Sequence, residues 1–314
     1  MKGPNPFAWN PESSEVFGRK TEITIFKSFA NATASKQSGV LVIFGGTGIG
    51  KTTLLRNFKQ IAEKFGLDCI YIKAEKSETE CDLVGKTFAN EKNFENAIRK
   101  IKTGTIIMID GIEKLAGSEK LADKLTRLVN SYWNKKPISI VLSSTREITR
   151  EGNRIIELRR FDEHDIREMI DNAMKKGLPK MGDECIHSIL NDSGGNPKLA
   201  RMICWYIYEK LKENEKLITK GHYLSYLPYI MTMLSNEWFG RLYQETPKAE
   251  REVLRKLAEE EMLVSEIAKE LKKPMGPVAT LTKRLLDRGQ IIRIERGRYR
   301  IFAKLYGKYI LQRN

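Results

Sequence analysis

The chain has 314 residues, of which 41% are hydrophobic and 30% are charged. This length allows two or three domains, each with a core of its own, and the composition is that of a folded globular chain. No apolar run approaches the ~20 residues that a membrane-spanning helix needs, and the start of the chain lacks the apolar core of a secretory signal. We therefore expect a cytoplasmic protein without a membrane partner.

The cysteines indicate neither a disulfide framework nor a zinc site. Cys69, Cys81, Cys185 and Cys204 form no C-x-x-C pair, and the chain has only three histidines. We expect reduced thiols buried in the core, as is usual in a cytoplasmic protein.

The formal net charge of +15 is a strong signal. A surface this basic favours a polyanionic partner, above all nucleic acid. The same lysines could instead form a solvated surface, and abundant Lys, Glu, Arg and Ile are also typical of proteins that work at high temperature. The distribution of charge along the chain decides between these interpretations.

A glycine-rich loop lies between a predicted buried strand, residues 40–44, and a predicted amphipathic helix, residues 51–65. The loop and the helix start read Gly45, Gly46, Thr47, Gly48, Ile49, Gly50, Lys51, Thr52 and Thr53. Glycines here allow positive φ and let backbone N–H groups converge on a triphosphate. Lys51 would reach the outer phosphates, and the Thr52 hydroxyl would bind Mg²⁺. This is the Walker A motif of P-loop NTPases, and it predicts ATP and Mg²⁺ as ligands.

Two further strands are predicted at residues 68–73 and 105–110, with surface helix and loop between them. The second strand is an uninterrupted apolar run that ends in Asp110, as a fully buried parallel strand does when it presents a carboxylate at its C-terminal edge. Asp110 resembles the Walker B aspartate, which holds Mg²⁺ through its water shell. The alternative is an acid that merely ends a strand.

The residue after Asp110 departs from the common AAA+ pattern, which has a glutamate that orients the attacking water. This chain has Gly111 there, and the first available acid is Glu113. Glu113 could act as the general base, or it could cap a helix that begins near Lys114. The departure predicts slow turnover, with the nucleotide acting as a switch more than as fuel.

A helix over residues 118–135 and a strand over residues 137–146 follow, and the strand ends in Ser144, Thr145 and Arg146. This tip resembles a signature of STAND ATPases, in which the arginine reads the γ-phosphate from the strand between the two Walker strands. A guanidinium suits that task because it is always charged and can bind phosphate with two hydrogen bonds. Arg146 could instead be a solvated loop residue, with Arg150 or Arg154 in its place.

Residues 154–158 predict a fifth strand, and helical spacing follows from residue 161 to about residue 217. Within it, the stretch from Gly194 to Lys198 resembles both the G-x-P motif of STAND ATPases and the sensor-2 segment of AAA+ lids. The resemblance implies that Pro197 and Lys198 contact the nucleotide, and an ordinary helix junction with proline at the first helical position is compatible with it. Residues 218–246 predict a helical connector whose aromatic residues pack between domains.

Residues 247–314 predict three helices, at about 249–258, 266–271 and 274–287, followed by a β-hairpin over 290–302. This order predicts a winged helix-turn-helix, in which the third helix enters the major groove. The segment holds 17 Lys and Arg and 9 Asp and Glu, a net +8 of the total +15. The residues placed to contact DNA are Lys272, Lys273, Lys283, Arg284, Arg293, Arg296, Arg298 and Arg300.

The whole layout, including a Gly18-Arg19 box ahead of the loop that implies an adenine-side contact for Arg19, resembles archaeal ATPases of the STAND/AAA+ group, close to origin-recognition initiators. The expected fold class is α/β, with a parallel five-stranded P-loop NTPase core (1–160), an α-helical lid and connector (161–246) and a C-terminal winged helix-turn-helix (247–314).

Together, the resemblance, the basic winged helix and the departure at Gly111 predict a slowly hydrolysing, nucleotide-switched ATPase. It would bind double-stranded DNA, in replication initiation or another DNA transaction, and form a nucleotide-dependent homo-oligomer. The first alternative is a STAND signalling switch, since many STAND ATPases use a winged helix to lock the nucleotide site instead of binding DNA. The second is a nucleotide-binding scaffold without activity, which only the unusual residue after Asp110 favours.

Overall fold

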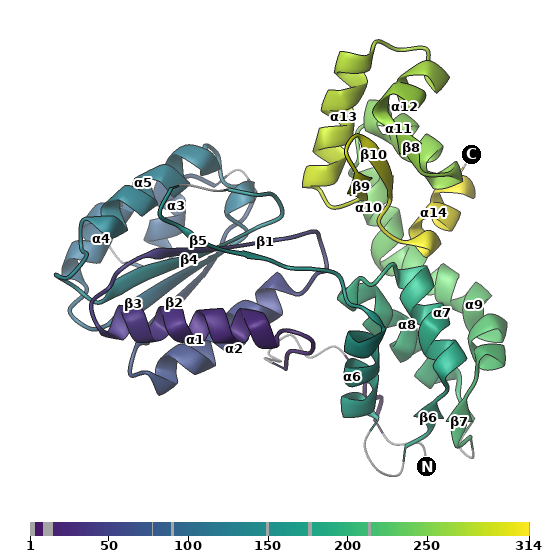
Figure 1. The fold of residues 1–314 in the computed structure, drawn as a ribbon, viewed down its shortest axis with the longest axis horizontal. Coiled ribbons are helices and arrows are strands. Elements are labelled where there is room, and N and C mark those ends of the chain that lie inside the picture. The colour runs from purple at the N-terminus through teal and green to yellow at the C-terminus, as the bar shows by residue number, and fades with distance from the viewer. Residues whose placement is uncertain are drawn as a thin grey trace. The chain divides into compact units, whose positions relative to one another are not determined.

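The computed structural model of the chain describes residues 4–8, 15–76, 78–88, 91–148, 151–174, 178–212 and 215–313. These residues form two compact units, whose elements are labelled in Figure 1. The core unit contains the described residues among 12–45 and 50–159, and the C-terminal unit contains those among 1–11, 46–49 and 160–314. The predicted division into three domains stays a prediction.

A five-stranded parallel sheet forms the centre of the core unit. Its strands are β1 (Val40–Phe44), β2 (Asp68–Lys73), β3 (Thr105–Asp110), β4 (Ile138–Ser144) and β5 (Arg154–Glu157). They lie in the order β2-β3-β4-β1-β5, and every neighbouring pair is parallel. All residues of β3 and β4 are buried, so apolar residues fill most of their positions without the alternation of a half-exposed strand. The predicted five-stranded P-loop NTPase core is confirmed.

Helices cover both faces of this sheet, as a parallel sheet requires. The helices of the core unit are α1 (Lys20–Ala34), α2 (Lys51–Lys64), α3 (Glu80–Gly85), α4 (Phe94–Lys100) and α5 (Ser118–Asn130). Figure 1 shows α1 and α2 on one face and α3, α4 and α5 on the other. The rings of Phe26 and Phe58 stack between α1 and α2 with centroids 3.9 Å apart. The strand order places β4 between the two Walker strands, as predicted, so the C-terminal ends of β1, β3 and β4 meet at one edge.

The first part of the C-terminal unit is helical. Its elements are α6 (Glu163–Ala173), β6 (Lys180–Met181), α7 (Asp183–Ser193), α8 (Pro197–Lys210), β7 (Leu217–Ile218), α9 (Lys220–Leu234), a π-helical turn (Ser235–Phe239) and α10 (Gly240–Gln244). The junction before α8 forms as predicted: Gly194 adopts positive φ, the Asn196 side chain caps the helix and Pro197 occupies its first turn. The two-residue strands β6 and β7 were not predicted, because so short a strand has no periodicity.

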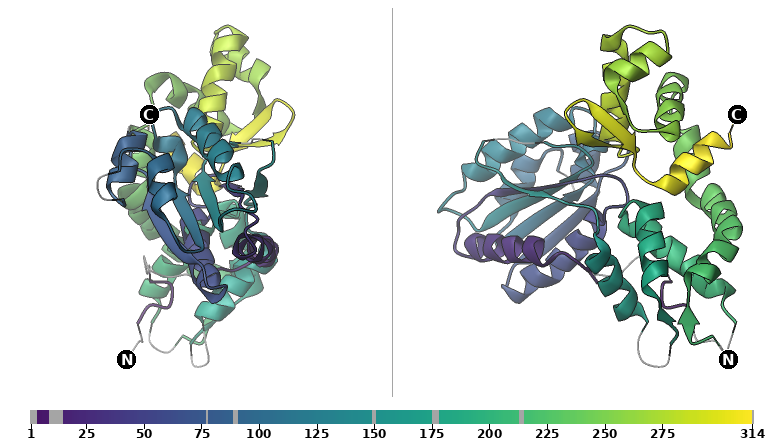
Figure 2. Two further views of the ribbon diagram at one scale, coloured as in Figure 1. Left: turned by 90° about the vertical axis from the view of Figure 1, so that its left-hand side faces the viewer. Right: turned by 45° about the vertical axis from the view of Figure 1, so that its right-hand side comes forward.

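The last part of the chain forms the C-terminal module, residues 248–311. Its elements are α11 (Lys248–Glu259), β8 (Met262–Leu263), α12 (Val264–Glu270), α13 (Met275–Asp287), β9 (Ile291–Glu295), β10 (Arg298–Ile301) and α14 (Lys304–Leu311). The three predicted helices and the hairpin are present, and the strands form an antiparallel sheet in the order β8-β10-β9. The hairpin, yellow in Figure 2, extends from the module in both views. Neither β8 nor α14 was predicted.

Aromatic side chains of the connector pack against the C-terminal module, as predicted. Trp238 lies 5.8 Å from Phe302, and Phe239 lies 5.2 Å from Tyr306, between ring centroids. All four rings are buried. The connector and the module therefore share one core within the C-terminal unit.

The cysteine prediction is right in part. Cys185 and Cys204 are buried, Cys69 is half-buried and Cys81 is exposed, so the expectation of core thiols is wrong for Cys81. Within the ranges that the structure describes, no helix has the length and apolar character needed to cross a membrane.

The guanidinium of Arg160 joins two segments of the C-terminal unit. It donates hydrogen bonds of 3.0 Å to the carbonyl oxygens of Gly194 and Phe302, and its burial lowers the pKa of Arg160 to about 10. Because that value is well above neutrality, the side chain stays charged at pH 7 and its donors stay strong.

We expect Arg160→Leu to lower the free energy of unfolding of the C-terminal unit by about 1–3 kcal/mol, because both carbonyl oxygens lose a buried donor. Native-state hydrogen exchange, which resolves the two units, is the measurement. Arg167→Leu on α6 is the matched control, since Arg167 makes exposed ion pairs with Glu163 and Asp183 that contribute little. Equal effects of the two substitutions would contradict the structural role of Arg160.

Candidate nucleotide-binding site

The loop between β1 and α2 has the backbone that the Walker A motif predicts. Gly48 and Gly50 adopt φ of 78° and 100°, in the left-handed region where a side chain is strained. Gly50 also precedes the first turn of α2, which begins without a side-chain cap. A helix start of this kind is suited to bind an anion through its N–H groups and its dipole.

Lys51 lies at the first position of α2. Its Nζ donates a 2.6 Å hydrogen bond to the carbonyl oxygen of Gly45. Burial lowers the pKa of Lys51 to about 8, while the nearby carboxylates of Glu113 and Asp110 act in the opposite direction and raise it. The ammonium is therefore held close to both acids of the site and to the start of the loop.

Asp110, at the end of β3, accepts three hydroxyl hydrogen bonds. Thr52 and Tyr71 each donate to its Oδ2 at 2.7 Å, and Ser143 donates to its Oδ1 at 2.5 Å. The residue is only 6% exposed. Burial by itself raises the pKa of this carboxyl, but the bonds from Ser143, Tyr71 and Thr52 outweigh burial, and the net pKa is lowered. Asp110 is thus an oriented carboxylate that stays ionised at neutral pH.

Tyr71 and Ser143 were not predicted as site residues. The register of the sheet explains their position, because Asp110 pairs with Lys73 on β2 and with Ser143 on β4. Ser143 carries a weak sequence signal, as a polar residue near the end of an apolar strand. Tyr71 carries none, because only the strand order places β2 beside β3.

The residue after Asp110 has a backbone conformation that favours glycine. Gly111 adopts φ of 83°, and a Cβ there would lie 2.9 Å from Nζ of Lys114. Its N–H donates to the carbonyl oxygen of Ser143 at 3.2 Å and to the Ser143 hydroxyl oxygen at 2.9 Å. A glutamate at this position would be strained, so the departure from the AAA+ pattern is part of the local fold.

Glu113 lies in a short 3₁₀ turn, Ile112–Lys114, and caps no helix. The predicted helix near Lys114 begins instead at Ser118, with Gly117 as its N-terminal cap residue, so the capping hypothesis is wrong. One carboxylate oxygen of Glu113, Oε2, is buried and has no hydrogen-bond partner among the described residues. An unsatisfied buried acceptor is unusual in native proteins and is typical of a site that binds a ligand or water. The general-base role stays a prediction.

Arg146 follows β4, whose end lies at the same edge of the sheet. Its Nη2 donates a 3.1 Å hydrogen bond to the Ser118 hydroxyl and lies 3.6 Å from a carboxylate oxygen of Glu119, so the side chain faces the start of α5. The alternative Arg154 is wrong: it pairs with Leu41 at the start of β1 and lies over the Phe29 ring, away from the loop that follows β1. The other alternative, Arg150, lies outside the described residues.

Arg19 is buried and engaged within the core unit. Its guanidinium is 3.2 Å from a carboxylate oxygen of Glu22 and donates a 2.8 Å hydrogen bond to the carbonyl oxygen of Arg159. The side chain therefore connects the start of α1 to the end of the segment that follows β5. Its predicted contact with adenine stays a prediction.

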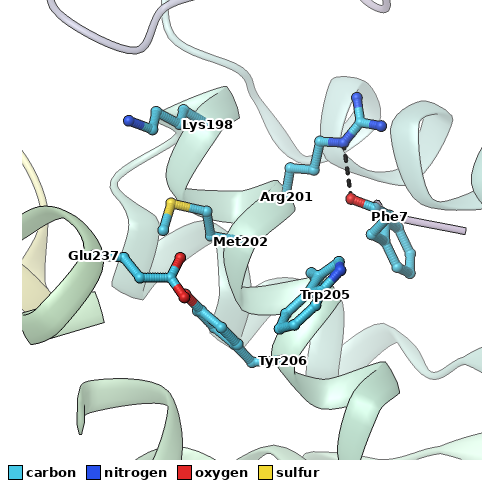
Figure 3. A pocket seen from close by; sticks show the side chains of 7 residues that line it. All are labelled: Phe7, Lys198, Arg201, Met202, Trp205, Tyr206 and Glu237. Carbon is cyan, nitrogen blue, oxygen red and sulfur yellow. Dashed lines mark hydrogen bonds between the residues drawn. The ribbon is translucent and has the colours of Figure 1, made fainter. Parts of the chain in front are cut away.

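Pro197 and Lys198 lie at the start of α8, in the C-terminal unit. The ammonium of Lys198 is 4.2 Å from the centroid of the Trp238 ring, and burial lowers the pKa of this lysine. Lys198 also lines a cavity of about 280 Å³. The other residues around this cavity are Phe7, Arg201, Met202, Trp205, Tyr206 and Glu237, as Figure 3 shows. Nucleotide contacts of Pro197 and Lys198 stay predictions.

The basic residues predicted to contact DNA differ in their surroundings. Five of them are exposed: Lys272, Lys283, Arg284, Arg293 and Arg296. Lys273 is ion-paired with Glu252, and Arg298 is ion-paired with Glu295 at 3.0 Å. Arg300 is partly buried, close enough to Arg160 to lower its pKa. The available positive charge is therefore concentrated at the two ends of α13 and on β9 and the hairpin turn.

The core unit matches a known family in sequence. Residues 15–159, somewhat less than half of the chain, match the family described as Bacterial DnaA ATPase domain. The chromosomal replication initiator protein DnaA of Aliarcobacter butzleri (strain RM4018) is 32% identical over 111 residues, which is 35% of this chain and 24% of that protein. The match therefore spans about a quarter of the length of this curated relative.

Solved structures resemble the chain over nearly its whole length. The Walker-type ATPase PABY2304 of Pyrococcus abyssi has a TM-score of 0.68 at 14% identity, over 98% of this chain and 99% of that one. The Aeropyrum pernix ORC1 protein, solved in complex with DNA, has a TM-score of 0.56 at 15% identity, over 98% and 96%. The Thermotoga maritima RuvB Holliday junction branch migration motor has a TM-score of 0.53 at 19% identity, over 94% and 95%.

At these identities, the solved structures establish a shared fold. The core unit is a P-loop NTPase core of the AAA+ type, and the chain is similar to AAA+ ATPases of the replication-initiator kind. The predicted resemblance is confirmed at this level.

We expect Gly111→Glu, which would introduce the usual AAA+ residue, to lower the free energy of unfolding of the core unit by about 1–3 kcal/mol, because glutamate would have to adopt positive φ. Gly85→Ala is the matched control, since a Cβ at Gly85 meets no atom within 4 Å and no positive φ is involved. Urea unfolding of both variants is the measurement. A Gly111→Glu protein as stable as the parent would show that the turn can rearrange.

Proposed function

We propose that the chain binds ATP with Mg²⁺ at the P-loop edge of the core unit, hydrolyses it slowly, and uses the bound nucleotide to control duplex-DNA binding by the C-terminal module. Replication initiation is the DNA transaction that the similarity to DnaA and ORC1 favours. The main support for a nucleotide site is the carboxylate of Asp110, which accepts a hydrogen bond from the Thr52 hydroxyl and lies close to Lys51.

The residues of the core unit fit the nucleotide and the metal ion. Gly50 adopts positive φ at the start of α2, where backbone N–H groups can bind phosphate oxygens, and Lys51 supplies a cation for the outer phosphates. Thr52 and Asp110 supply a hydroxyl and a carboxylate, which are the oxygen ligands that Mg²⁺ prefers. The ion would neutralise phosphate charge. Tyr71 and Ser143 hold Asp110 in place for this task.

Glu113 is the proposed general base. Its buried, unpartnered oxygen can accept a proton from a water molecule, and its charge lies near Lys51. The left-handed turn at Gly111 places this acid two residues beyond the usual position, on a 3₁₀ turn. We infer slow hydrolysis from this displacement. Arg146 would sense the γ-phosphate from the end of β4.

The basic C-terminal module supports the DNA part of the proposal. It has the element order of a winged helix-turn-helix, a net charge of +8 over residues 247–314, and exposed cations on α13 and the hairpin. Nucleotide-dependent self-association is the further expectation. Charge of this density on a helix-and-hairpin surface favours a polyanion over a neutral partner.

A STAND-type signalling switch is the second candidate. Two observations favour it: Lys273 and Arg298 are neutralised by acids, and the Ser144–Arg146 tip resembles the STAND signature. In this case the module would make protein or intramolecular contacts. Nucleotide-dependent self-association with little affinity for DNA would favour this candidate.

We expect the parent chain to hydrolyse ATP at less than about 1 per second, and Glu113→Gln to be about 10²-fold slower, because a general base contributes at least that factor. ATP binding by this variant, measured by calorimetry, should be unchanged. Glu95→Gln, at an exposed ion pair on α4, is the matched control. Parent rates of several per second would contradict slow turnover, and full activity of Glu113→Gln would contradict the base.

Asp110→Asn tests whether the chain is an enzyme. We expect it to weaken Mg²⁺-dependent ATP binding and to abolish turnover, because an amide cannot replace the charge that the ion needs. Calorimetric titration of ATP with and without Mg²⁺ is the measurement. Turnover equal to that of the parent would show that the measured hydrolysis does not come from this site, and would favour the scaffold hypothesis.

We expect the full chain to bind duplex DNA with an affinity that falls steeply with salt and depends on whether ATP, ADP or no nucleotide is present. Charge reversal of Lys283 and Arg293 to Glu should remove binding without unfolding the module, because both side chains are exposed. Fluorescence anisotropy of labelled duplexes at several salt concentrations is the measurement. Absence of binding in every nucleotide state would favour the signalling candidate.

A further inference from the structure

The first half of α13 exposes no charged or amide side chain, the groups that discriminate most strongly between base pairs. Its exposed residues are Met275, Gly276, Pro277, Ala279 and Thr280. Of these, only Thr280 has a polar side chain, and its hydroxyl already donates a 3.1 Å hydrogen bond to the carbonyl oxygen of Gly276. Met275 is 61% exposed and offers only apolar contact.

This half of the helix is the part that matters for sequence recognition. In helix-turn-helix proteins, residues near the N-terminus of the recognition helix contact the base edges. Discrimination between base pairs comes mainly from Arg, Lys, Asn, Gln, Glu or Asp in the major groove. The first charged side chain of α13 is Lys283, eight residues after the helix begins at Met275.

Exposed cations precede and follow this apolar surface along the chain. Lys272 precedes α13, Lys283 and Arg284 lie on its last turns, and Arg296 lies at the turn of the hairpin. None of these four forms an ion pair with any residue that the structure describes. Positive charge that flanks an apolar helix face is suited to the two phosphate backbones on either side of a groove.

We propose that the C-terminal module binds duplex DNA through phosphate contacts and shape, without reading base sequence. The inference rests on the proposed DNA-binding function and adds that the substrate class is duplex DNA of any sequence. The small residues at the start of α13 let the helix approach the groove closely, and Lys283, Arg284 and Arg296 supply the attraction. Arg284 is the arginine of this set that lies on α13 itself, and its planar fork could also bind a guanine with two hydrogen bonds.

The test compares full-length protein on duplexes of equal length and base composition but permuted sequence, in the nucleotide state that binds most tightly. We expect dissociation constants that agree within about threefold across the set, since each base pair that is read changes affinity by roughly tenfold or more. A spread of tenfold or more would overturn the proposal. Absence of binding to every duplex would instead overturn the DNA-binding function on which the proposal rests.

Arg284→Ala separates phosphate contact from base reading. We expect it to weaken binding by the same factor on every duplex and to reduce the slope of log affinity against log salt by about 0.9, the value for one phosphate contact. A loss confined to duplexes with a particular guanine, with an unchanged salt slope, would show that Arg284 reads sequence. Lys216→Ala, which removes an exposed lysine outside the module, is the matched control and should change neither quantity.

Discussion

The carboxylate of Asp110 is the group on which the candidate site depends. A charge buried at the end of a fully apolar strand is unfavourable unless it is hydrogen-bonded, and here three hydroxyl groups satisfy it. These donors come from three different elements: α2, β2 and β4. The strand order β2-β3-β4-β1 brings them together, because it places β3 between β2 and β4 and puts the Walker A loop one strand further along the same edge.

Local patterns in the sequence predicted where the strands of the core unit begin and end, but not the order of the strands in the sheet. Strands β2 and β3 have the predicted bounds. For β3 the reason is that a buried parallel strand is mostly apolar and ends abruptly at a polar residue. The Tyr71 contact depends on strand order, which no local pattern contains. Arg154 was wrongly considered for the site because its short distance from Arg146 along the chain says nothing of which end of a strand it occupies.

The left-handed backbone conformation of Gly111 limits where an acidic residue can follow Asp110. The left-handed turn at Gly111 lets its N–H donate to Ser143, the same residue whose hydroxyl donates to Asp110. A glutamate after Asp110 would strain this turn and disturb the serine whose hydroxyl donates a hydrogen bond to the Asp110 carboxylate. The acid is therefore displaced to the following 3₁₀ turn, where one of its oxygens is buried without a partner. The positive φ of Gly111 thus favours glycine over glutamate at the position directly after Asp110.

The C-terminal unit divides its basic residues between structure and surface. Arg160 is buried against two carbonyl oxygens and supports the fold, whereas Lys273 and Arg298 are ion-paired with acids at the surface. The remaining cations flank an apolar helix face that lacks amide and carboxylate groups. Net charge alone would not distinguish this arrangement from a sequence-reading surface, because both are basic. The distinction lies in which exposed positions carry hydrogen-bonding groups. In the first half of α13 these positions are filled by methionine, glycine, proline, alanine and one threonine.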